Sequence, residues 1–244
     1  TLVVGASGAT GRLLVQQLLM KNEKVSVIVR SKERFLSTLD DNFKTDGRLS
    51  VMEADLLTLS IEELVAQVKG CRAVVSCLGH NLTLKGIYGH PRRLVTEFVY
   101  RVCTAICFSS VNQQPVKFIL MNSTGNRNVA ADEKLPKFDA IVINLIRALL
   151  PPHADNEEAA DYLQNRLENR NNKIEWAVVR PDSLINEGSV SNYKVYTSPV
   201  CSALFGDGKT SRVNVAHFMS QLVLNVDCWE QWKNQMPVIY NTDI

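Results

Sequence analysis

The first twelve residues, TLVVGASGATGR, constrain the fold of this chain more than any other stretch. A short apolar run ends at Gly5, and a glycine-rich turn then leads into an apolar segment that begins at Leu13. The spacing Gly-x-x-Gly-x-x-Gly suits a turn in which one glycine reverses the chain, one lets the backbone approach a phosphate, and one lets a helix pack closely on the strand. The pattern predicts a strand, a tight turn, and a helix that opens at the third glycine, Gly11.

A helix start of this kind can bind phosphate groups. Its first backbone N–H groups have no partner within the helix, and the positive end of the helix dipole attracts anions. The alternative is a structural turn without a ligand, but its place between a strand and a helix favours a nucleotide site. The residues expected to contact the nucleotide are Gly5, Ser7, Gly8, Ala9, Thr10, Gly11 and Arg12.

The second apolar run, residues 24–30, reads as a buried strand and ends in the residue that bears on cofactor choice. Dinucleotide-binding folds often carry Asp or Glu about 20 residues past the glycines, where it binds the ribose 2′-hydroxyl. This chain has Arg30 there, followed by Ser31 and Arg34. A guanidinium can grip a 2′-phosphate with two hydrogen bonds, whereas a carboxylate repels it. The sequence therefore favours NADP; the alternative is a solvated basic turn that starts a helix.

The rest of the chain alternates between strand and helix patterns. This alternation predicts an α/β fold, a Rossmann-like doubly wound parallel sheet with helices on both faces, in a single domain over residues 1–244. Residues 182–211 contain glycine and serine but no strong helix pattern, and we expect them to form a small C-terminal cap facing the substrate. The expected strands lie at 49–54, 73–79, 116–121, 174–181 and 237–240, and the expected helices at 60–68, 91–108, 138–149, 155–169 and 213–225.

Ligands of open α/β sheets bind outside the carboxyl ends of the strands, so the residues that follow each strand are candidate site residues. Asp55 could accept a hydrogen bond from adenine, or could equally be a turn or cap residue. Ser123 could donate to or polarise a substrate, or could complete the hydrogen bonding at the strand end. The candidates for cofactor binding at these ends are Asp55, Leu56, Cys77, Leu78, Gly79, Asn122, Ser123 and Pro181, and those for catalysis are Ser123, Thr124 and His153.

Composition excludes several classes of protein. The net charge of +2 gives no reason to expect a nucleic-acid or membrane-surface partner. No apolar run approaches the roughly 20 residues of a membrane helix, and we expect no signal peptide because the chain opens on a strand. Six cysteines without a C-x-x-C pair and four dispersed histidines indicate a cytoplasmic protein without a metal site. The apolar helix at 138–149 could serve as a contact in a homodimer.

Four motifs together resemble those of a known family: residues 5–12 (GASGATGR), 29–31 (VRS), 55–56 (DL) and 176–181 (WAVVRP). They are similar to those of the atypical short-chain dehydrogenase/reductases, in the NmrA-like NAD(P)-binding branch that includes biliverdin reductase B-like proteins. The resemblance implies a Rossmann core with NADP across the carboxyl edge of the sheet. It also implies a small C-terminal cap that closes over the nicotinamide.

The chain departs from ordinary members of the larger family, which use a serine together with Tyr-x-x-x-Lys as a proton relay. Alignment by the entry into the strand at 174–181 puts the tyrosine position near Pro152 and the lysine position near Asn156. Tyr162-x-x-x-Arg166 has a similar spacing but lies later in the helix, and arginine does not replace lysine at such a site. We interpret that pair as an exposed helix face.

Two functions remain. The first is an NADP(H)-dependent oxidoreductase, a reductase of the atypical short-chain type that acts on an unidentified small-molecule acceptor without the Tyr-x-x-x-Lys relay. The second is a non-catalytic NADP-binding redox sensor or regulatory protein of NmrA type. A weaker third is a sugar-nucleotide enzyme of the extended short-chain family, which normally keeps the Tyr/Lys pair and has a larger C-terminal domain. We favour the reductase.

Overall fold

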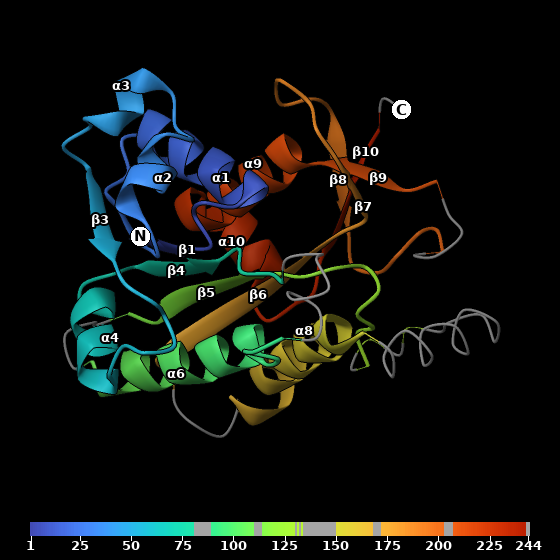
Figure 1. The fold of residues 1–244 in the computed structure, drawn as a ribbon. Coiled ribbons are helices and arrows are strands. Elements are labelled where there is room, and N and C mark those ends of the chain that lie inside the picture. Colours follow the sequence, from blue (N-terminus) through green and yellow to red (C-terminus); the bar gives the residue numbers. More distant parts are fainter. Residues whose placement is uncertain are drawn as a thin grey trace.

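The fold is built on one eight-stranded sheet, in which the strand order is β3-β2-β1-β4-β5-β6-β10-β8 (Figure 1). The structure, a computed structural model, describes residues 1–80, 89–109, 114–129, 131, 133, 150–167, 172–202 and 207–242. Neighbouring strands of this sheet are parallel except for the antiparallel pair β10 and β8. The strands are β1 (Leu2–Val4), β2 (Val25–Val29), β3 (Leu49–Glu53), β4 (Ala73–Ser76), β5 (Val116–Met121), β6 (Ile174–Pro181), β8 (Tyr193–Tyr196) and β10 (Val238–Asn241).

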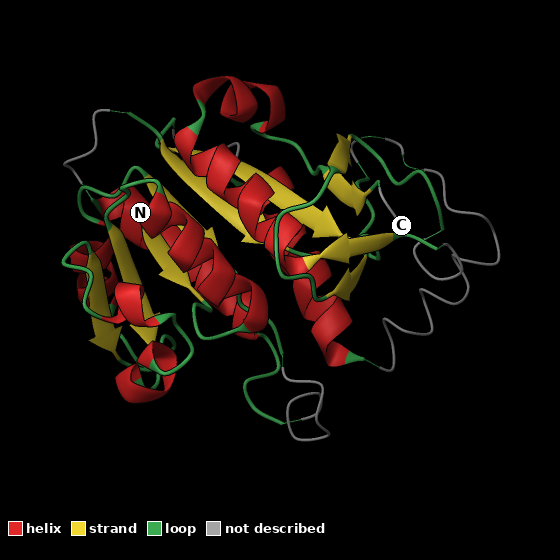
Figure 2. Cartoon of the chain, turned by 90° about the horizontal axis from the view of Figure 1, so that it is seen from above, coloured by secondary structure: helices red, strands yellow, loops and turns green. Residues whose placement is uncertain are grey.

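Helices cover both faces of the sheet, as Figures 1 and 2 show. One face carries α1 (Ala9–Met20), α2 (Lys32–Leu36), α3 (Asp41–Lys44), α9 (Arg212–Leu224) and α10 (Val226–Trp232). The other carries α4 (Ile61–Val68), α6 (Leu94–Phe108) and α8 (Pro151–Asp161), which continues as the π-helical turn η1 (Tyr162–Arg166). The predicted fold class, a Rossmann-like doubly wound sheet, is confirmed.

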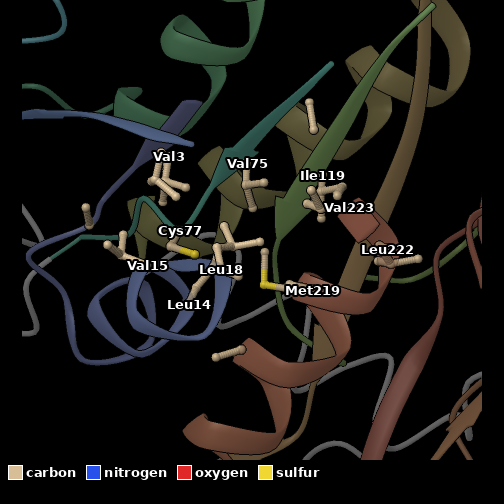
Figure 3. Close-up of a cluster of buried hydrophobic side chains, with 14 of the residues drawn as sticks. Val3, Leu14, Val15, Leu18, Val75, Cys77, Ile119, Met219, Leu222 and Val223 are labelled. Carbon is tan, nitrogen blue, oxygen red and sulfur yellow. The ribbon is translucent and has the colours of Figure 1, made fainter. Parts of the chain in front are cut away.

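Two hydrophobic clusters form the core, one on each face of the sheet. Val3, Val75 and Ile119 pack against α1 and α9 (Figure 3), while Val4 and Leu120 pack on the side of α4 and α6. A strand covered on both faces needs apolar residues at successive positions rather than at alternate ones. This is why short runs of consecutive apolar residues in the sequence were sufficient to locate the strands.

Several predicted helix boundaries are wrong. Helix α1 begins at Ala9 with Gly8 as its N-cap, rather than at Gly11. Helix α6 begins at Leu94 rather than Pro91. Helix α8 begins at Pro151 rather than Asp155, because proline fits the first turn of a helix, where its missing N–H is not needed. The helix expected at 60–68 is present as α4, with Ser60 as its N-cap and a capping box between Ser60 and Glu63. The expected helix at 138–149 lies outside the described residues.

The predicted cap region, residues 182–211, contains short strands. β7 (Ser183–Ile185) and β9 (Lys209–Ser211) form a separate parallel pair, and β8 extends the main sheet. In its described part the region has no helix, as its sequence indicated. Helix α10, which follows α9 directly, was not predicted.

Arg180, near the end of β6, ties several segments together and is fully buried. Its Nη1 and Nη2 atoms donate to the Glu133 carboxylate at 2.8 and 2.6 Å, and also to the carbonyls of Asn126 and Thr197. Its Nε donates to the Met236 carbonyl at 2.8 Å. All the N–H donors of a guanidinium are thereby used, which is what makes a buried charge tolerable.

We predict that Arg180→Gln lowers the free energy of unfolding by about 3–5 kcal/mol, because it leaves the buried Glu133 carboxylate without its counter-ion. Urea unfolding followed by circular dichroism measures the change. Arg127→Gln is the matched control, since Arg127 is exposed and its loss should cost no more than about 0.5 kcal/mol. Equal, small effects of the two substitutions would contradict the structural role of Arg180.

Candidate functional site

The strand order reverses between β1 and β4, and open α/β sheets form their ligand crevice at such a position. From β1 the chain proceeds to β2 and β3 on one side, and then crosses to β4 on the other. Gly5 follows β1 here with a φ of +70°, and a side chain on it would come within 2.5 Å of the Cys77 carbonyl carbon. Only glycine meets both conditions, and the crevice is where open α/β sheets bind their ligands.

The start of α1 faces this crevice without a side-chain cap. Its N-cap is Gly8, no side chain hydrogen-bonds to the cap position, and the first turn contains no acidic residue. A Cβ on Gly11 would come within 2.9 Å of the Gly5 carbonyl carbon, so this glycine lets the helix pack directly on the turn. Of the predicted phosphate-contacting residues, Ser7, Gly8, Ala9 and Arg12 are exposed and Thr10 is buried.

The end of β2 presents two arginines. Arg30 and Arg34 are exposed, and neither forms an ion pair with any residue that the structure describes. Ser31 is the N-cap of α2, and its Oγ accepts from the backbone N–H of Arg34 at 3.2 Å. The Glu53 carboxylate accepts from the Lys32 N–H at 2.6 Å, which directs it at the start of α2. The segment is therefore a basic turn that starts a helix, and its contact with a 2′-phosphate stays a prediction.

Asp55 and Leu56 follow β3. The Asp55 carboxylate accepts from the Leu57 N–H at 3.0 Å, so the turn role left open by the sequence is present. Asp55 is exposed and Leu56 is half-buried. Their contact with adenine stays a prediction.

The end of β4 contributes mainly backbone to the crevice. Cys77 is buried, and burial raises the pKa of its thiol to about 12, so it is a neutral thiol rather than a nucleophile. Leu78 is half-buried and Gly79 is exposed.

The end of β5 is tied to α8 through the Asn156 carbonyl. The side-chain amides of Asn122 and Asn126 donate to this oxygen at 2.9 and 3.2 Å. Ser123 is exposed, and its Oγ accepts from the Gly125 N–H at 3.2 Å, which is the structural role that the sequence left open. Thr124 is buried, and its backbone N–H donates to the carbonyl of Pro181 at 3.1 Å. Pro181 is also buried.

Two of the three catalytic candidates lie beside the same glycine. A Cβ on Gly125 would lie 3.6 Å from Ser123 Oγ and 3.7 Å from His153 Cε1. His153 Nε2 is 4.0 Å from a carboxylate oxygen of Glu157, on the next turn of α8. The structure thus brings Ser123 and His153 together at the carboxyl edge, whereas Thr124 is buried there.

The interpretation of Tyr162 as part of an exposed helix face is wrong. Tyr162 is buried, with its ring edge-to-face on Tyr100 of α6 at a centroid distance of 5.7 Å. Arg166 is exposed, and its Nε lies 3.7 Å from a carboxylate oxygen of Asp161. The stacking partner comes from another helix, so the local spacing gave no sign of it.

The contact between His80 and Asp155 at this edge was not predicted from the sequence. His80, just after β4, lies with its Nε2 2.7 Å from Asp155 Oδ2, and both side chains are buried. Asp155 also accepts from the backbone N–H groups of Val95 and Thr96, so it caps α6 rather than starting its own helix. These partners are 59 to 75 residues away in the sequence, beyond the reach of any local pattern.

Asp182 follows β6 and is also buried. Burial raises the pKa of its carboxyl group, although the Ser183 N–H donates to it at 2.7 Å.

The six cysteines are free thiols. Among the described residues, no group of histidine, cysteine and acidic side chains could hold a metal ion, and no helix is long and apolar enough to cross a membrane.

A family model described as NAD(P)H-binding matches residues 5–225. Comparison with curated protein sequences gives no match. ChuY, an anaerobilin reductase from Escherichia coli O157:H7, has a similar structure, with a TM-score of 0.64, 16% identity, and coverage of 100% of this chain and 97% of that one.

Two further structures show the same fold. A short-chain dehydrogenase/reductase from Veillonella parvula in complex with NADP has a TM-score of 0.64 and 14% identity over 99% of this chain and 94% of that one. The oxidoreductase ylbE from Lactococcus lactis has a TM-score of 0.66 and 14% identity over 99% of this chain and 90% of that one. The predicted NAD(P)-binding family and Rossmann-like fold are thereby confirmed, and the chain belongs to the NAD(P)H-binding family.

Proposed function

We propose that this protein is an NADPH-dependent reductase of a small-molecule acceptor. The observation that carries the proposal is the position of Ser123 and His153 at the carboxyl edge, together with the glycine cradle between β1 and β4. The cradle suits a dinucleotide, and the two polar side chains lie at the end of β5, toward which a dinucleotide bound across this edge would extend.

The residues of the cradle fit the diphosphate of such a cofactor. Gly5 and Gly11 bring the turn, β4 and α1 into close contact, and the exposed backbone around Gly8 lies at the positive end of α1. The exposed guanidinium groups of Arg30, directly after β2, and of Arg34, in the following helix α2, lie near the end of β2, next to β1, where a 2′-phosphate would need them. We therefore assign the cofactor as NADP rather than NAD.

A bound reduced nicotinamide supplies a hydride, and the protein supplies binding, orientation and electrostatics. The Ser123 hydroxyl can donate a hydrogen bond to an acceptor oxygen while it accepts from Gly125. The carboxyl end of β5 is held against α8 by the amides of Asn122 and Asn126, which fixes the position of Ser123. The similar structures of an anaerobilin reductase and of an NADP complex support this proposal.

A sensor that binds NADP without oxidising it is the second candidate. Pro152 and Asn156 stand near the positions where ordinary family members have tyrosine and lysine, and the Asn156 carbonyl already accepts two side-chain amides. Proline has no side-chain proton to donate. These positions favour the sensor, whereas the exposed hydroxyl of Ser123 favours the reductase.

Titration of the purified protein with NADPH and NADH, followed by nicotinamide fluorescence, separates the two functions. Quinones, flavins, small carbonyls and a linear tetrapyrrole are then added to the NADPH complex. Oxidation of NADPH by one of these acceptors supports the reductase. Tight binding without oxidation by any of them supports the sensor, and the absence of binding contradicts both.

We predict that Arg30→Ala weakens NADPH binding about 10- to 150-fold, the loss of a charge-assisted contact worth about 1.5–3 kcal/mol. NADH affinity should change less than about 2-fold, since NADH has no 2′-phosphate. Lys24→Ala, which removes a positive charge at the opposite end of β2, is the matched control and should leave both affinities unchanged. Equal loss of NADPH and NADH affinity in Arg30→Ala would remove the 2′-phosphate assignment.

We predict that Ser123→Ala lowers kcat about 2- to 13-fold, because the acceptor loses a hydrogen bond worth about 0.5–1.5 kcal/mol. The turn also loses the contact with the Gly125 N–H. The NADPH dissociation constant should stay within about 2-fold of the wild-type value. Ser183→Ala, an exposed serine after β6, is a control for general disturbance of the edge. Unchanged turnover in Ser123→Ala would exclude Ser123 from catalysis.

A further inference from the structure

We propose that His80, held by Asp155, is the general acid that protonates the acceptor during reduction. This role rests on the reductase function proposed above. It supplies the proton source for which the tyrosine and lysine of ordinary family members would otherwise be needed. His80 follows β4 and Asp155 lies on α8, at the edge that carries Ser123.

The pair is built as a buried, oriented contact. The distance from His80 Nε2 to Asp155 Oδ2 is 2.7 Å, and the side chains are 4% and 0% exposed. Asp155 Oδ2 also accepts from the Val95 N–H at 2.8 Å, and Oδ1 accepts from the Thr96 N–H at 2.9 Å. The Thr96 hydroxyl donates to the Asp155 carbonyl, so side chain and backbone are both fixed on the start of α6.

These contacts assign the tautomer of the ring. Both carboxylate oxygens of Asp155 accept backbone N–H groups, so the carboxylate acts as an acceptor toward His80 as well, and Nε2 carries hydrogen. The other ring nitrogen, Nδ1, then gains or loses the mobile proton, and it has no hydrogen-bond partner among the described residues. A carboxylate that orients a histidine and stabilises its charged form is the arrangement that lets imidazole exchange protons in hydrolases.

The position of the pair places it beside the other site residues. His80 follows Gly79 at the carboxyl end of β4, the strand next to β5. Asp155 is adjacent in α8 to Asn156, whose carbonyl binds the side chains that end β5, and it is two residues from His153. His80 contacts Asp155, and Ser123 follows Asn122, whose side-chain amide binds the carbonyl of the next residue, Asn156. His80 and Ser123 thus follow adjacent strands and both lie near the first turns of α8.

The proposed step balances. A carbonyl-type acceptor receives a hydride, with its two electrons, on carbon from NADPH, the reductant of the proposed function. The Nδ1–H bond of the His80 imidazolium breaks as an O–H bond forms on the acceptor oxygen. The product is an alcohol, the imidazole is left neutral with Nε2–H still on Asp155, and a proton from solvent restores the imidazolium.

Other charged groups on the helices near His80 are engaged with one another. Arg93, at the start of α6, pairs with Glu158 of α8. His153 lies 4.0 Å from Glu157. Asp155 is thus the carboxylate that the structure shows in contact with the His80 ring, among the residues that it describes.

The first test uses the protein without acceptor. Long-range ¹H–¹⁵N spectra of histidine-labelled protein resolve the ring nitrogens, and His80→Gln identifies the signal of His80. We expect Nε2–H in the neutral form and uptake of the second proton at Nδ1 as the pH is lowered. A neutral ring with hydrogen on Nδ1, or a ring that takes up no proton before the protein unfolds, would overturn the acid role whatever the activity.

The second test measures NADPH oxidation by the acceptor that the wild-type protein reduces best. Loss of the acid should lower kcat of His80→Gln by about 10²–10⁴-fold, since glutamine keeps a donor for Asp155 but cannot give up a proton. Any pH dependence of kcat that the His80 ring gives the wild-type protein should be absent from His80→Gln, because glutamine has no ring nitrogen to protonate. NADPH affinity should be unchanged in the variant, and His90→Gln, an exposed histidine, is the control.

A second variant separates an acid from a purely structural contact. His80→Ala should recover part of its turnover when imidazole is added, which a merely structural role would not allow. Wild-type turnover together with an unimpaired His80→Gln variant overturns the acid assignment and leaves the reductase standing. A wild-type protein that binds NADPH but reduces no acceptor overturns the reductase, and the acid role with it.

Discussion

The contact between the β1–α1 turn and the end of β4 is the constraint on which the rest of the site depends. Gly5 has a backbone conformation with φ of +70°, and it stands so close to the Cys77 carbonyl that no side chain fits between them. The chain can therefore turn within a few residues from β1 to the Gly8 N-cap. Since Gly11 in turn packs on the Gly5 carbonyl, α1 lies directly over the strand with its first N–H groups directed at the crevice.

The sequence revealed the strand, the turn and the helix of this arrangement because these three parts are local. The apolar runs located β1 to β6 since buried parallel strands are apolar on both faces, and the order of such strands places their carboxyl ends at one edge. Helix ends were harder to predict. Pro91 and Asp155 both look like helix starts, yet α6 begins at Leu94 and α8 at Pro151, because the cap of α6 is the side chain of Asp155 from a different helix.

The burial of polar groups was the least predictable feature, because their partners also lie far away in the sequence. Arg180 was noticed as part of an Arg-Pro motif, but its structural role depends on acceptors supplied by the segments around Asn126, Glu133, Thr197 and Met236. Each of these partners is far from Arg180 in sequence, and none belongs to a recognisable motif. The candidate site could thus be located from the sequence as an edge of the sheet, whereas its internal contacts could not.

These buried contacts bear on how an atypical family member could work without a tyrosine–lysine relay. The contacts of Asp155 and Asn122 join α6 and α8 to the ends of β4 and β5, and those of Arg180 join β6 to the segments around Asn126 and Glu133. Hydrogen-bonded networks whose members are satisfied are rigid. Such an edge holds backbone and side chains in place before any ligand arrives. When the cofactor carries out the difficult chemistry, orientation is the main contribution that the protein must make, and a rigid edge can provide it without the usual pair. The distinction between a reductase and a sensor then depends on one proton donor rather than on the fold.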